Sequence, residues 1–456
     1  MGGGVAACLV RTLHRHLHRI MNIVRPRLRV PSFRARAVVA VASACWLVSL
    51  GMASTQAPLQ PSQYRNHPAI AYGATPTADP VARLGEALKR GDVKLTYTPG
   101  RGGYLRSILD ALAVPVESQM LVFSKTSFQA PRIGPKNPRA IYFNDTVAVG
   151  FVKGSDVLEF VAQDGRQGGV FYTLKQSPDA VPVFERNSAV CVQCHAFEGT
   201  QYVPGMFIGS VYPGADGLAM YGPTFTTDHR SLFERRWGGW FVTGTHSGAS
   251  HMGNAVVTNP ADLTSMITPE TVHVTDLAGR FDGAEYQSMS SDLVALLVIE
   301  HQSQMLNRLT RIGWEARIGT AAVGRPLTEM ASDVVDYMLF VDETVLPGPI
   351  AGTTAFAERF QQGGPRDQRG RSLRELDLRT RLLKYPCSYL IYSEPFTELP
   401  AEAKAAIYAS LWAVLSGAET APRYARLTAG DRQAILEILR DTKPDLPDYF
   451  RAAPRS

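Results

Sequence analysis

The chain has 456 residues, of which 45% are hydrophobic and 19% are charged, which is typical of globular proteins large enough for two or three domains. The formal net charge of +6 would favour an anionic partner such as nucleic acid. The basic excess lies in the first 36 residues, however, which contain eight arginines and no acid, and the rest of the chain has 39 basic and 41 acidic residues. This distribution excludes a nucleic-acid-binding surface on the body of the protein.

Residues 1–53 have the parts of a secretory signal peptide. The basic stretch is followed by an apolar run over residues 37–50 and by small residues suited to cleavage after Ala53. Met21 could be the true start of translation. The alternative is a leader that stays uncleaved as a membrane anchor, although the apolar run is shorter than the roughly 20 residues that a membrane span requires. We expect an exported protein that touches a membrane only if this leader is retained.

Residues 54–80 are rich in Pro, Ala, Thr and Gln without a clear period, which predicts a flexible linker. Residues 81–180 should form a β-rich region, in which short β-branched and aromatic segments are separated by turn residues. Short helices are expected at residues 79–89 and 105–113, with a strand entering a glycine-rich turn at residues 94–104. The predicted strands of a mainly antiparallel sheet are 120–125, 140–144, 147–152, 157–162 and 169–174.

Residues 181–287 contain few periodic runs and many Gly, Thr, His and Trp residues, which predicts a loop-rich segment with a binding role. Residues 288–456 are helical in character, and the run Ser290-Ser291-Asp292 can cap a helix whose apolar stripe includes Leu297 and His301. His301 on that stripe is interpreted as a core histidine. Further helices are predicted at 328–343, 372–384, 400–415 and 428–441, and the fold class is therefore α+β.

The strongest chemical pattern is the pentapeptide Cys191-Val192-Gln193-Cys194-His195. Each of the two thiols can add to one vinyl group of a haem, and the adjacent histidine can then bind the iron as an axial ligand. A half zinc site and a thioredoxin-type redox pair are the alternatives, but no second cysteine pair and no strand before the motif are evident. The motif thus predicts one covalently bound haem c, held by Cys191, Cys194 and His195.

The ligand at the sixth iron position would decide how such a haem is used. Three candidates lie after the motif: Met206 in a proline and glycine turn, His251, and His246 between glycines. A sixth protein ligand favours electron transfer, which is the leading hypothesis. An open sixth position favours a haem-dependent, peroxidase-like oxidoreductase, which is the alternative.

Two further features concern the C-terminal part of the chain. Residues 365–384 carry seven basic and three acidic residues, which we interpret as a solvated face, with docking of an acidic redox partner as the alternative. Cys387 lies among apolar residues and is expected to be a buried structural thiol. With so few cysteines after the leader, the chain is not a disulfide scaffold.

Together with the haem motif, four short segments resemble exported bacterial proteins that contain a cytochrome c domain. These segments are 210–213, 235–240, 243–246 and 251–254. The resemblance implies a covalent haem attached on the outer face of the inner membrane, and hence a periplasmic location. It implies no particular reaction, substrate or redox partner protein.

Overall fold

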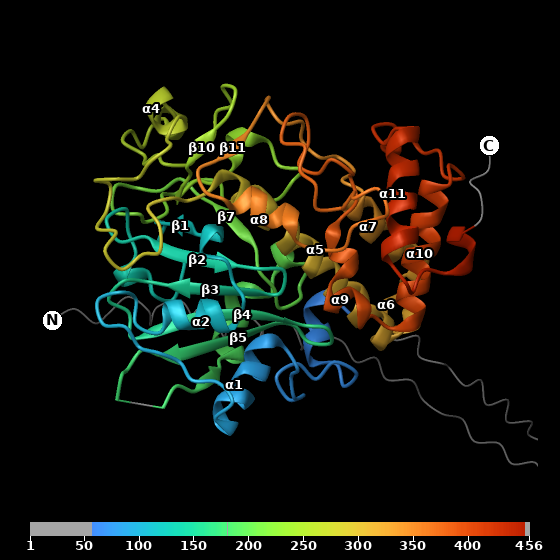
Figure 1. The fold of residues 1–456 in the computed structure, drawn as a ribbon, viewed down its shortest axis with the longest axis horizontal. Coiled ribbons are helices and arrows are strands. Elements are labelled where there is room, and N and C mark those ends of the chain that lie inside the picture. Colours follow the sequence, from blue (N-terminus) through green and yellow to red (C-terminus); the bar gives the residue numbers. More distant parts are fainter. Residues whose placement is uncertain (1–56, 180, 452–456) are drawn as a thin grey trace, which may run out of the picture. The chain divides into compact units, whose positions relative to one another are not determined.

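The computed structural model describes residues 57–179 and 181–451, so the predicted signal peptide lies outside the described residues. Helices and a mostly antiparallel sheet are both present, which confirms the α+β class (Figure 1). The strands are β1 (Met120–Val122), β2 (Arg139–Phe143), β3 (Val147–Phe151), β4 (Val157–Asp164), β5 (Gly168–Lys175), β6 (Phe184–Arg186), β7 (Ile208–Ser210), β8 (Phe225–Thr227), β9 (Trp240–Phe241), β10 (Gly244–Thr245) and β11 (Ala351–Gly352). The α-helices are α1 (Pro80–Arg90), α2 (Leu105–Ala111), α3 (Ser188–His195), α4 (Pro269–Val272), α5 (Leu293–Ile318), α6 (Thr320–Val323), α7 (Leu327–Met338), α8 (Phe356–Gln362), α9 (Glu394–Thr397), α10 (Ala401–Leu415) and α11 (Ala429–Thr442).

The main sheet has seven strands in the order β6-β5-β4-β3-β2-β1-β9, and each neighbouring pair is antiparallel. The five predicted strands are β1 to β5, which follow one another in both sequence and space. Short turns make this possible. Between β2 and β3, for example, the side-chain oxygen of Asn144 accepts hydrogen bonds from the backbone N–H groups of Thr146 and Val147.

The two faces of the sheet belong to different cores, because successive side chains of a strand point to opposite sides. Tyr142 and Val149 pack with α1 and α2 on one face, where Figure 1 shows α2 lying over the strands. Phe143 and Ala148 pack with α5 on the other face. The sheet is therefore covered on both sides, and the second face also carries α3.

Helix α5 separates the sheet from the C-terminal helices. Its N-cap is Asp292, as predicted, and the Asp292 carboxylate accepts hydrogen bonds from the N–H groups of Val294 and Ala295. Farther along the helix, the Gln302 amide donates to the carbonyl of Asn144 in the β2–β3 turn. Nearly every residue of α5 is buried, so its polar side chains must find partners inside the protein.

The C-terminal helices confirm three of the predicted segments and correct one. Helices α10 and α11 lie within one residue of the predicted bounds, whereas α7 begins as predicted but ends at Met338, five residues early. Thr428 and Asp431 form the capping box expected at the start of α11. Residues 372–384 were predicted to be helical, and this was wrong. The Asp377 carboxylate binds the backbone N–H groups of Thr380 and Arg381 and stabilises a tight turn instead.

Two predictions near the N-terminus also need correction. The described part of the predicted linker, residues 57–80, packs on the body through Tyr64 and Ile70, which are 2% and 0% exposed. Burial of these two apolar side chains stabilises the packing of the segment on the body, although its composition is typical of a flexible linker. The expected strand before the glycine turn is absent, since residues 94–97 are irregular, but a turn from Thr98 to Gly103 is present.

The predicted loop-rich segment, 181–287, contains only short strands and helices, as expected. No helix in the described ranges, 57–179 and 181–451, combines the length and the apolar character needed to cross a membrane.

Candidate functional site

The CxxCH motif forms the last five residues of the short helix α3, which lies against β5. Asn187 anchors the start of this helix: its backbone N–H donates to the Phe171 carbonyl at 2.9 Å and its side chain to Thr173 at 2.6 Å. Cys191 and Cys194 are three residues apart on the helix, a spacing that places their Cβ atoms about 5–6 Å from each other on one side. Both thiols are free, Cys191 being half-buried and Cys194 exposed. The pair is therefore available for a covalent reaction from the same side of α3.

The imidazole of His195 is held by one of its two nitrogens. Nδ1 lies 2.9 Å from the carbonyl oxygen of Gly205, and the Gly205 N–H donates to the carbonyl of His195 at 3.0 Å. A carbonyl oxygen only accepts hydrogen bonds, so Nδ1 carries the proton and Nε2 keeps its lone pair. Burial lowers the pKa of His195, with the Gly205 carbonyl opposing the shift, so the ring is neutral at pH 7. A neutral imidazole with one fixed nitrogen is the state that a metal ligand requires.

Helix α5 fixes the carbonyl that orients His195. A Cβ atom at Gly205 would lie 1.9 Å from the side-chain oxygen of Asn307, so only glycine allows this close approach. The Asn307 amide in turn donates to the carbonyl of Met206 at 2.8 Å. Asn307 and Gly205 are the positioning residues that sequence reasoning missed, and no local pattern around either residue indicates the contact.

An ion pair on the sheet lies next to the motif. Arg139 on β2 and Glu159 on β4 meet at 2.5 Å over Gly150, and both charges act on Cys191 and His195. The Nε atom of Arg139 is buried and has no hydrogen-bond partner. A guanidinium with an unsatisfied N–H suits a carboxylate ligand, such as the propionate of a haem.

The state of the Cys191 thiol bears on the alternatives to haem. Burial, and to a lesser degree Glu159, raise the pKa of Cys191 to about 11, with Arg139 opposing the shift. Redox-active and nucleophilic cysteines have a pKa below the ordinary value, because the thiolate is the reactive form. The expectation that no strand precedes the motif was wrong, since β6 ends at Arg186 just before α3, but the raised pKa of Cys191 is unlike that of a thioredoxin-type pair. The donor set of two thiols, one oriented imidazole and a nearby guanidinium fits a covalent haem.

The histidines proposed for the sixth position, His246 and His251, lie together in a second cluster. Their ring centroids are 5.4 Å apart, and His251 also contacts Trp237 at 5.3 Å. None of the ring contacts in the described part of the chain joins either residue to His195. The structure thus brings His246 and His251 together with each other rather than with the motif.

The hydrogen bonds of these two rings differ in a way that matters for iron binding. Nδ1 of His251 accepts the N–H of Gly253 at 3.1 Å, so the proton of the neutral ring is on Nε2, which has no free lone pair. Nε2 of His246 faces the carbonyl of Val272 at 3.0 Å, so Nδ1 of His246 keeps its lone pair, and this atom is buried without a partner. Of the two, His246 has the tautomer that can bind a metal.

Met206, the third candidate, comes directly after Gly205. Its side chain packs against the core formed with α5 and lines a small cavity with Val161 on β4 and Leu306 on α5. A sixth ligand must approach the iron from the side opposite His195, whereas the backbone of Met206 is one residue away from the carbonyl that holds the His195 ring. In this arrangement Met206 is directed into the protein interior.

The described residues also contain a buried polar cluster on α5. His301 is a core histidine, as predicted: it is fully buried, its Nδ1 lies 2.9 Å from Nδ1 of His229, and its Nε2 lies 2.8 Å from the hydroxyl of Ser388. The neighbouring Glu300 forms a buried ion pair with Arg236 at 2.8 Å, and Arg236 also donates to the carbonyl of His229. His229 was not expected from the sequence, since nothing distinguishes it from a surface histidine between Asp228 and Arg230.

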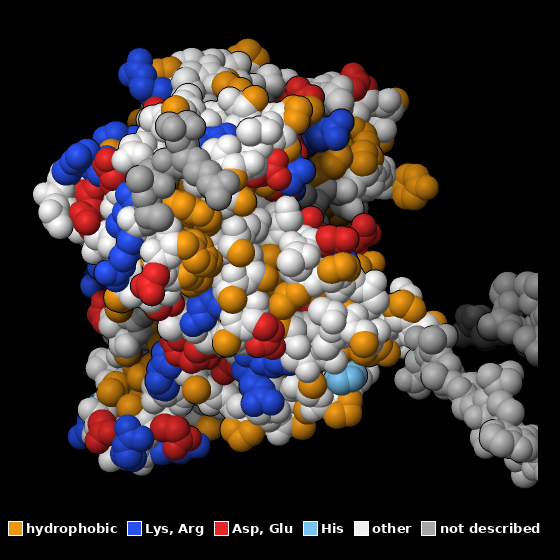
Figure 2. All heavy atoms as spheres, turned by 90° about the vertical axis from the view of Figure 1, so that its right-hand side faces the viewer, with side chains coloured by type: hydrophobic (Ala, Val, Ile, Leu, Met, Phe, Trp, Pro, Cys, Tyr) orange, Lys and Arg blue, Asp and Glu red, His pale blue; other side chains and the backbone are white. Residues whose placement is uncertain are grey.

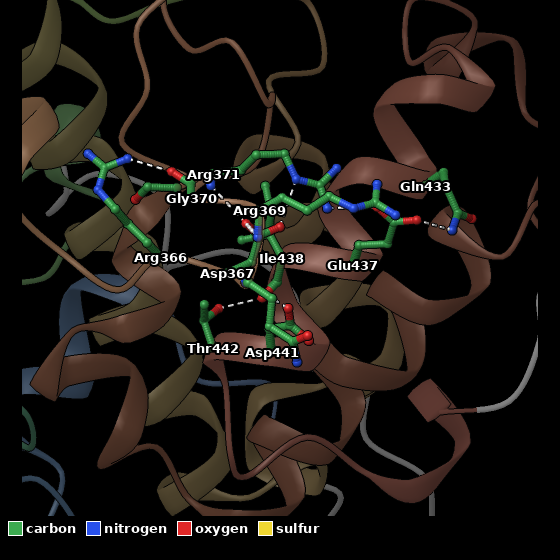
Figure 3. A network of polar contacts seen from close by, with 12 residues as sticks. Arg366, Asp367, Arg369, Gly370, Arg371, Gln433, Glu437, Ile438, Asp441 and Thr442 are labelled. Carbon is green, nitrogen blue, oxygen red and sulfur yellow. Dashed lines mark hydrogen bonds and ion pairs between the residues drawn. The ribbon is translucent and has the colours of Figure 1, made fainter.

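The basic stretch 365–384 is largely neutralised by contacts within the protein. In Figure 3, Arg369 and Arg371 both bind Glu437 of α11, and Arg371 also binds Asp367. Figure 2 shows basic and acidic side chains interspersed on the face that carries α10 and α11. Further ion pairs of the stretch are Arg374–Asp145, Arg381–Asp431 and Lys384–Glu375. The stretch therefore joins parts of the fold rather than forming an open basic surface.

Cys387 is fully buried, as predicted for a structural thiol, and burial raises its pKa to about 12. In the ranges 57–179 and 181–451, no three His, Cys, Asp or Glu side chains are grouped so that they could hold a metal ion.

Comparisons of the chain with known protein families, with curated proteins and with solved structures found no match. The fold class, α+β, is thus the level at which the structure classifies the protein.

Proposed function

We propose that the protein is an exported c-type cytochrome that binds one haem covalently and transfers electrons. The observation that carries this proposal is the state of His195, whose Nδ1–H is committed to the Gly205 carbonyl and whose Nε2 is left as a donor atom. This imidazole stands on the same helix as two free thiols at the spacing of a haem attachment motif.

Each residue of the motif has a separate role. The Cys191 and Cys194 thiols would hold the haem through two thioether bonds, each formed by addition of S–H across one vinyl double bond with no leaving group. Nε2 of His195 would bind the iron. When bound, the haem supplies an iron centre that changes its charge by one electron.

The surrounding residues prepare this site. Phe171 and Phe207 flank the His195 ring, with centroid distances of 5.0 and 5.4 Å. Arg139 is placed to pair with a propionate through its unsatisfied N–H. The leader, residues 1–53, supports export to the periplasm, where covalent haem attachment takes place in proteins that the sequence resembles.

A haem-dependent, peroxidase-like oxidoreductase is the second candidate function. It is favoured by the geometry of two proposed sixth ligands, since Met206 packs into the interior and His251 has its proton on the nitrogen that would bind. If neither residue binds the iron, and His246 does not reach it, a substrate can take the sixth position.

The test uses the full chain with its leader, produced in a host that attaches haem to exported proteins. We expect a red protein with one iron per chain whose haem stain survives denaturation, and Cys191→Ala with Cys194→Ala should abolish that stain. Cys387→Ala is the matched control and should keep it. Stoichiometric zinc without iron would refute the proposal.

The absorption spectrum of the same protein separates the two functions. A low-spin spectrum that cyanide and carbon monoxide leave unchanged supports electron transfer, since the sixth position is then filled. A high-spin spectrum that both ligands shift supports the oxidoreductase.

A further inference from the structure

A cavity of about 360 Å³ opens where the turn between β2 and β3 faces α8. Its volume is in the range of small-molecule sites, roughly 300–1,000 Å³. It shares Thr146 and Gln302 with the small cavity beside Met206, but it contains no residue of the haem motif.

Aromatic rings form the apolar part of the wall. Phe143, Phe356 and Phe360 are 2%, 4% and 7% exposed, and successive ring centroids are 5.5 and 6.0 Å apart. Only small parts of these rings reach the cavity, and they offer the edge contacts that another aromatic ring prefers. A planar, apolar body fits this wall better than a flexible polar one.

The amide side chains of the wall are already engaged. The Gln302 amide donates to the Asn144 carbonyl at 2.7 Å, and its oxygen accepts from the Tyr389 hydroxyl at 2.7 Å. The Asn144 side chain donates to the Leu112 carbonyl at 3.0 Å and accepts the two N–H groups of the β2–β3 turn. These hydrogen bonds fix the orientation of both amides and stabilise the wall.

Two arginines supply the charge. Arg374 is fixed by Asp145 and by stacking on Phe360 and Tyr389, at 4.8 and 4.3 Å from the ring centroids. The Arg359 side chain is 58% exposed, and its nearest carboxylate oxygen, on Glu117, is 3.7 Å away. With Asp145 as the lining carboxylate, the charged groups of the wall sum to one positive charge. Guanidinium groups only donate hydrogen bonds, so they select an anionic acceptor.

We propose that this cavity binds a small aromatic carboxylate, with the ring against Phe143, Phe356 and Phe360 and the carboxylate on Arg359 and Arg374. The shape and the apolar wall select the ring, and the two guanidinium groups select the anion. This site does not depend on the haem, because it uses none of the residues that hold it.

Isothermal titration calorimetry of the haem-loaded protein with benzoate tests the proposal. We expect saturable binding, and benzyl alcohol, which has the same ring without the charge, should bind at least about tenfold more weakly. Cyclohexanecarboxylate keeps the charge but not the flat ring, and it should also bind more weakly. Equal affinity for all three compounds, or no benzoate binding, would overturn the assignment.

Variants then place the binding at this cavity. Arg359→Gln should weaken benzoate binding by about tenfold, since it removes one charge-assisted hydrogen bond from an exposed position that folding does not need. Arg379→Gln removes an exposed arginine outside the cavity and should leave the affinity unchanged. If both variants bind benzoate like the unmodified protein, the ligand sits elsewhere and the proposal is wrong.

Discussion

His195 on α3 and His301 on α5 show how the surroundings of a histidine define its use. His301 is fully buried and His195 is partly buried, and burial lowers the pKa of both. They differ in their hydrogen bonds: His195 has a partner at one nitrogen, the Gly205 carbonyl, whereas His301 has partners at both, His229 and Ser388. Burial alone therefore does not distinguish the two histidines, whereas the unused nitrogen of His195 makes it the better candidate ligand of the two.

The largest expected effect is on the haem absorption spectrum, which should change on substitution of His195 but not of His301. His195→Ala should abolish the native absorption spectrum, because the proposed iron ligand is lost, and it should also reduce the haem stain of the denatured protein, because His195 belongs to the attachment motif. His301→Ala should leave the spectrum of the folded protein unchanged. Recording both spectra in parallel tests this difference. An altered haem spectrum in folded His301→Ala would contradict the different roles assigned to the two histidines.

The buried polar cluster around His301 should instead carry stability. Arg236 and Glu300 are 2% and 0% exposed, so Arg236→Met leaves a buried carboxylate without its partner. Loss of one partner from a buried pair costs roughly 3–5 kcal/mol. The lower end is expected, because burial raises the pKa of Glu300 to about 7 and allows it to become neutral. Urea unfolding measures the change.

The matched control for that experiment is Arg325→Met, which removes an arginine from exposed ion pairs with Glu329 and Asp333. Exposed pairs contribute about 0–1 kcal/mol. An equal loss of stability in the two variants would contradict the role assigned to the buried pair.

The pH dependence of stability tests the neutral state of the histidine pair. Burial, with Arg308 and Arg230 adding to it, lowers the pKa of His301 to about 3, well below the unfolded value near 6.5. Between these two values the unfolded chain binds the proton and the folded protein does not, so acidification from pH 6.5 towards pH 3 removes stability. The contribution of His301 approaches about 1.4 kcal/mol per pH unit in that window.

His301→Gln keeps a hydrogen-bonding side chain but cannot take up this proton. Its free energy of unfolding should fall less steeply between pH 6 and pH 4 than that of the unmodified protein, as followed by urea unfolding at several pH values. Parallel pH profiles would show that His301 is not neutral in the folded state.

The smallest expected effect concerns the support behind His195. Asn307→Ala removes the hydrogen bond to the Met206 carbonyl and should lower stability by about 1 kcal/mol. A looser Gly205 carbonyl weakens the bond to His195 Nδ1–H, which makes the imidazole a poorer donor to ferric iron. The midpoint potential should therefore rise, and a redox titration measures it. An unchanged potential would show that α5 does not act on the ligand.

Local sequence patterns predicted the elements of the fold that depend on interactions between residues close together in the chain. The β-branched runs gave β1 to β5, and the caps at Asp292 and Thr428 marked the starts of α5 and α11. The wrong helix at 372–384 has apolar residues at helical spacing, but the Asp377 turn competes with that pattern at close range.

Features that depend on distant contacts could not be predicted. The three residues of the haem motif are evident from five consecutive letters, whereas the tautomer of His195 depends on Gly205 and Asn307. The packing of Tyr64 in the supposed linker depends in the same way on Arg311 of α5, which lies over its ring at 4.5 Å. Spacing along the chain contains no information on such contacts.

The contact between Asn307 and the loop after the motif also sets an order of events. Asn307 comes 101 positions after Met206, so a chain exported as proposed would emerge with both cysteines and His195 before α5. Until then the His195 imidazole would lack the support that Gly205 and Asn307 provide in the folded protein. Covalent attachment at the motif would then precede folding, and the final geometry of the proposed iron ligand would be acquired when α5 docks. The motif would thus serve first as a recognition site for the attachment machinery and only later as part of a folded redox centre.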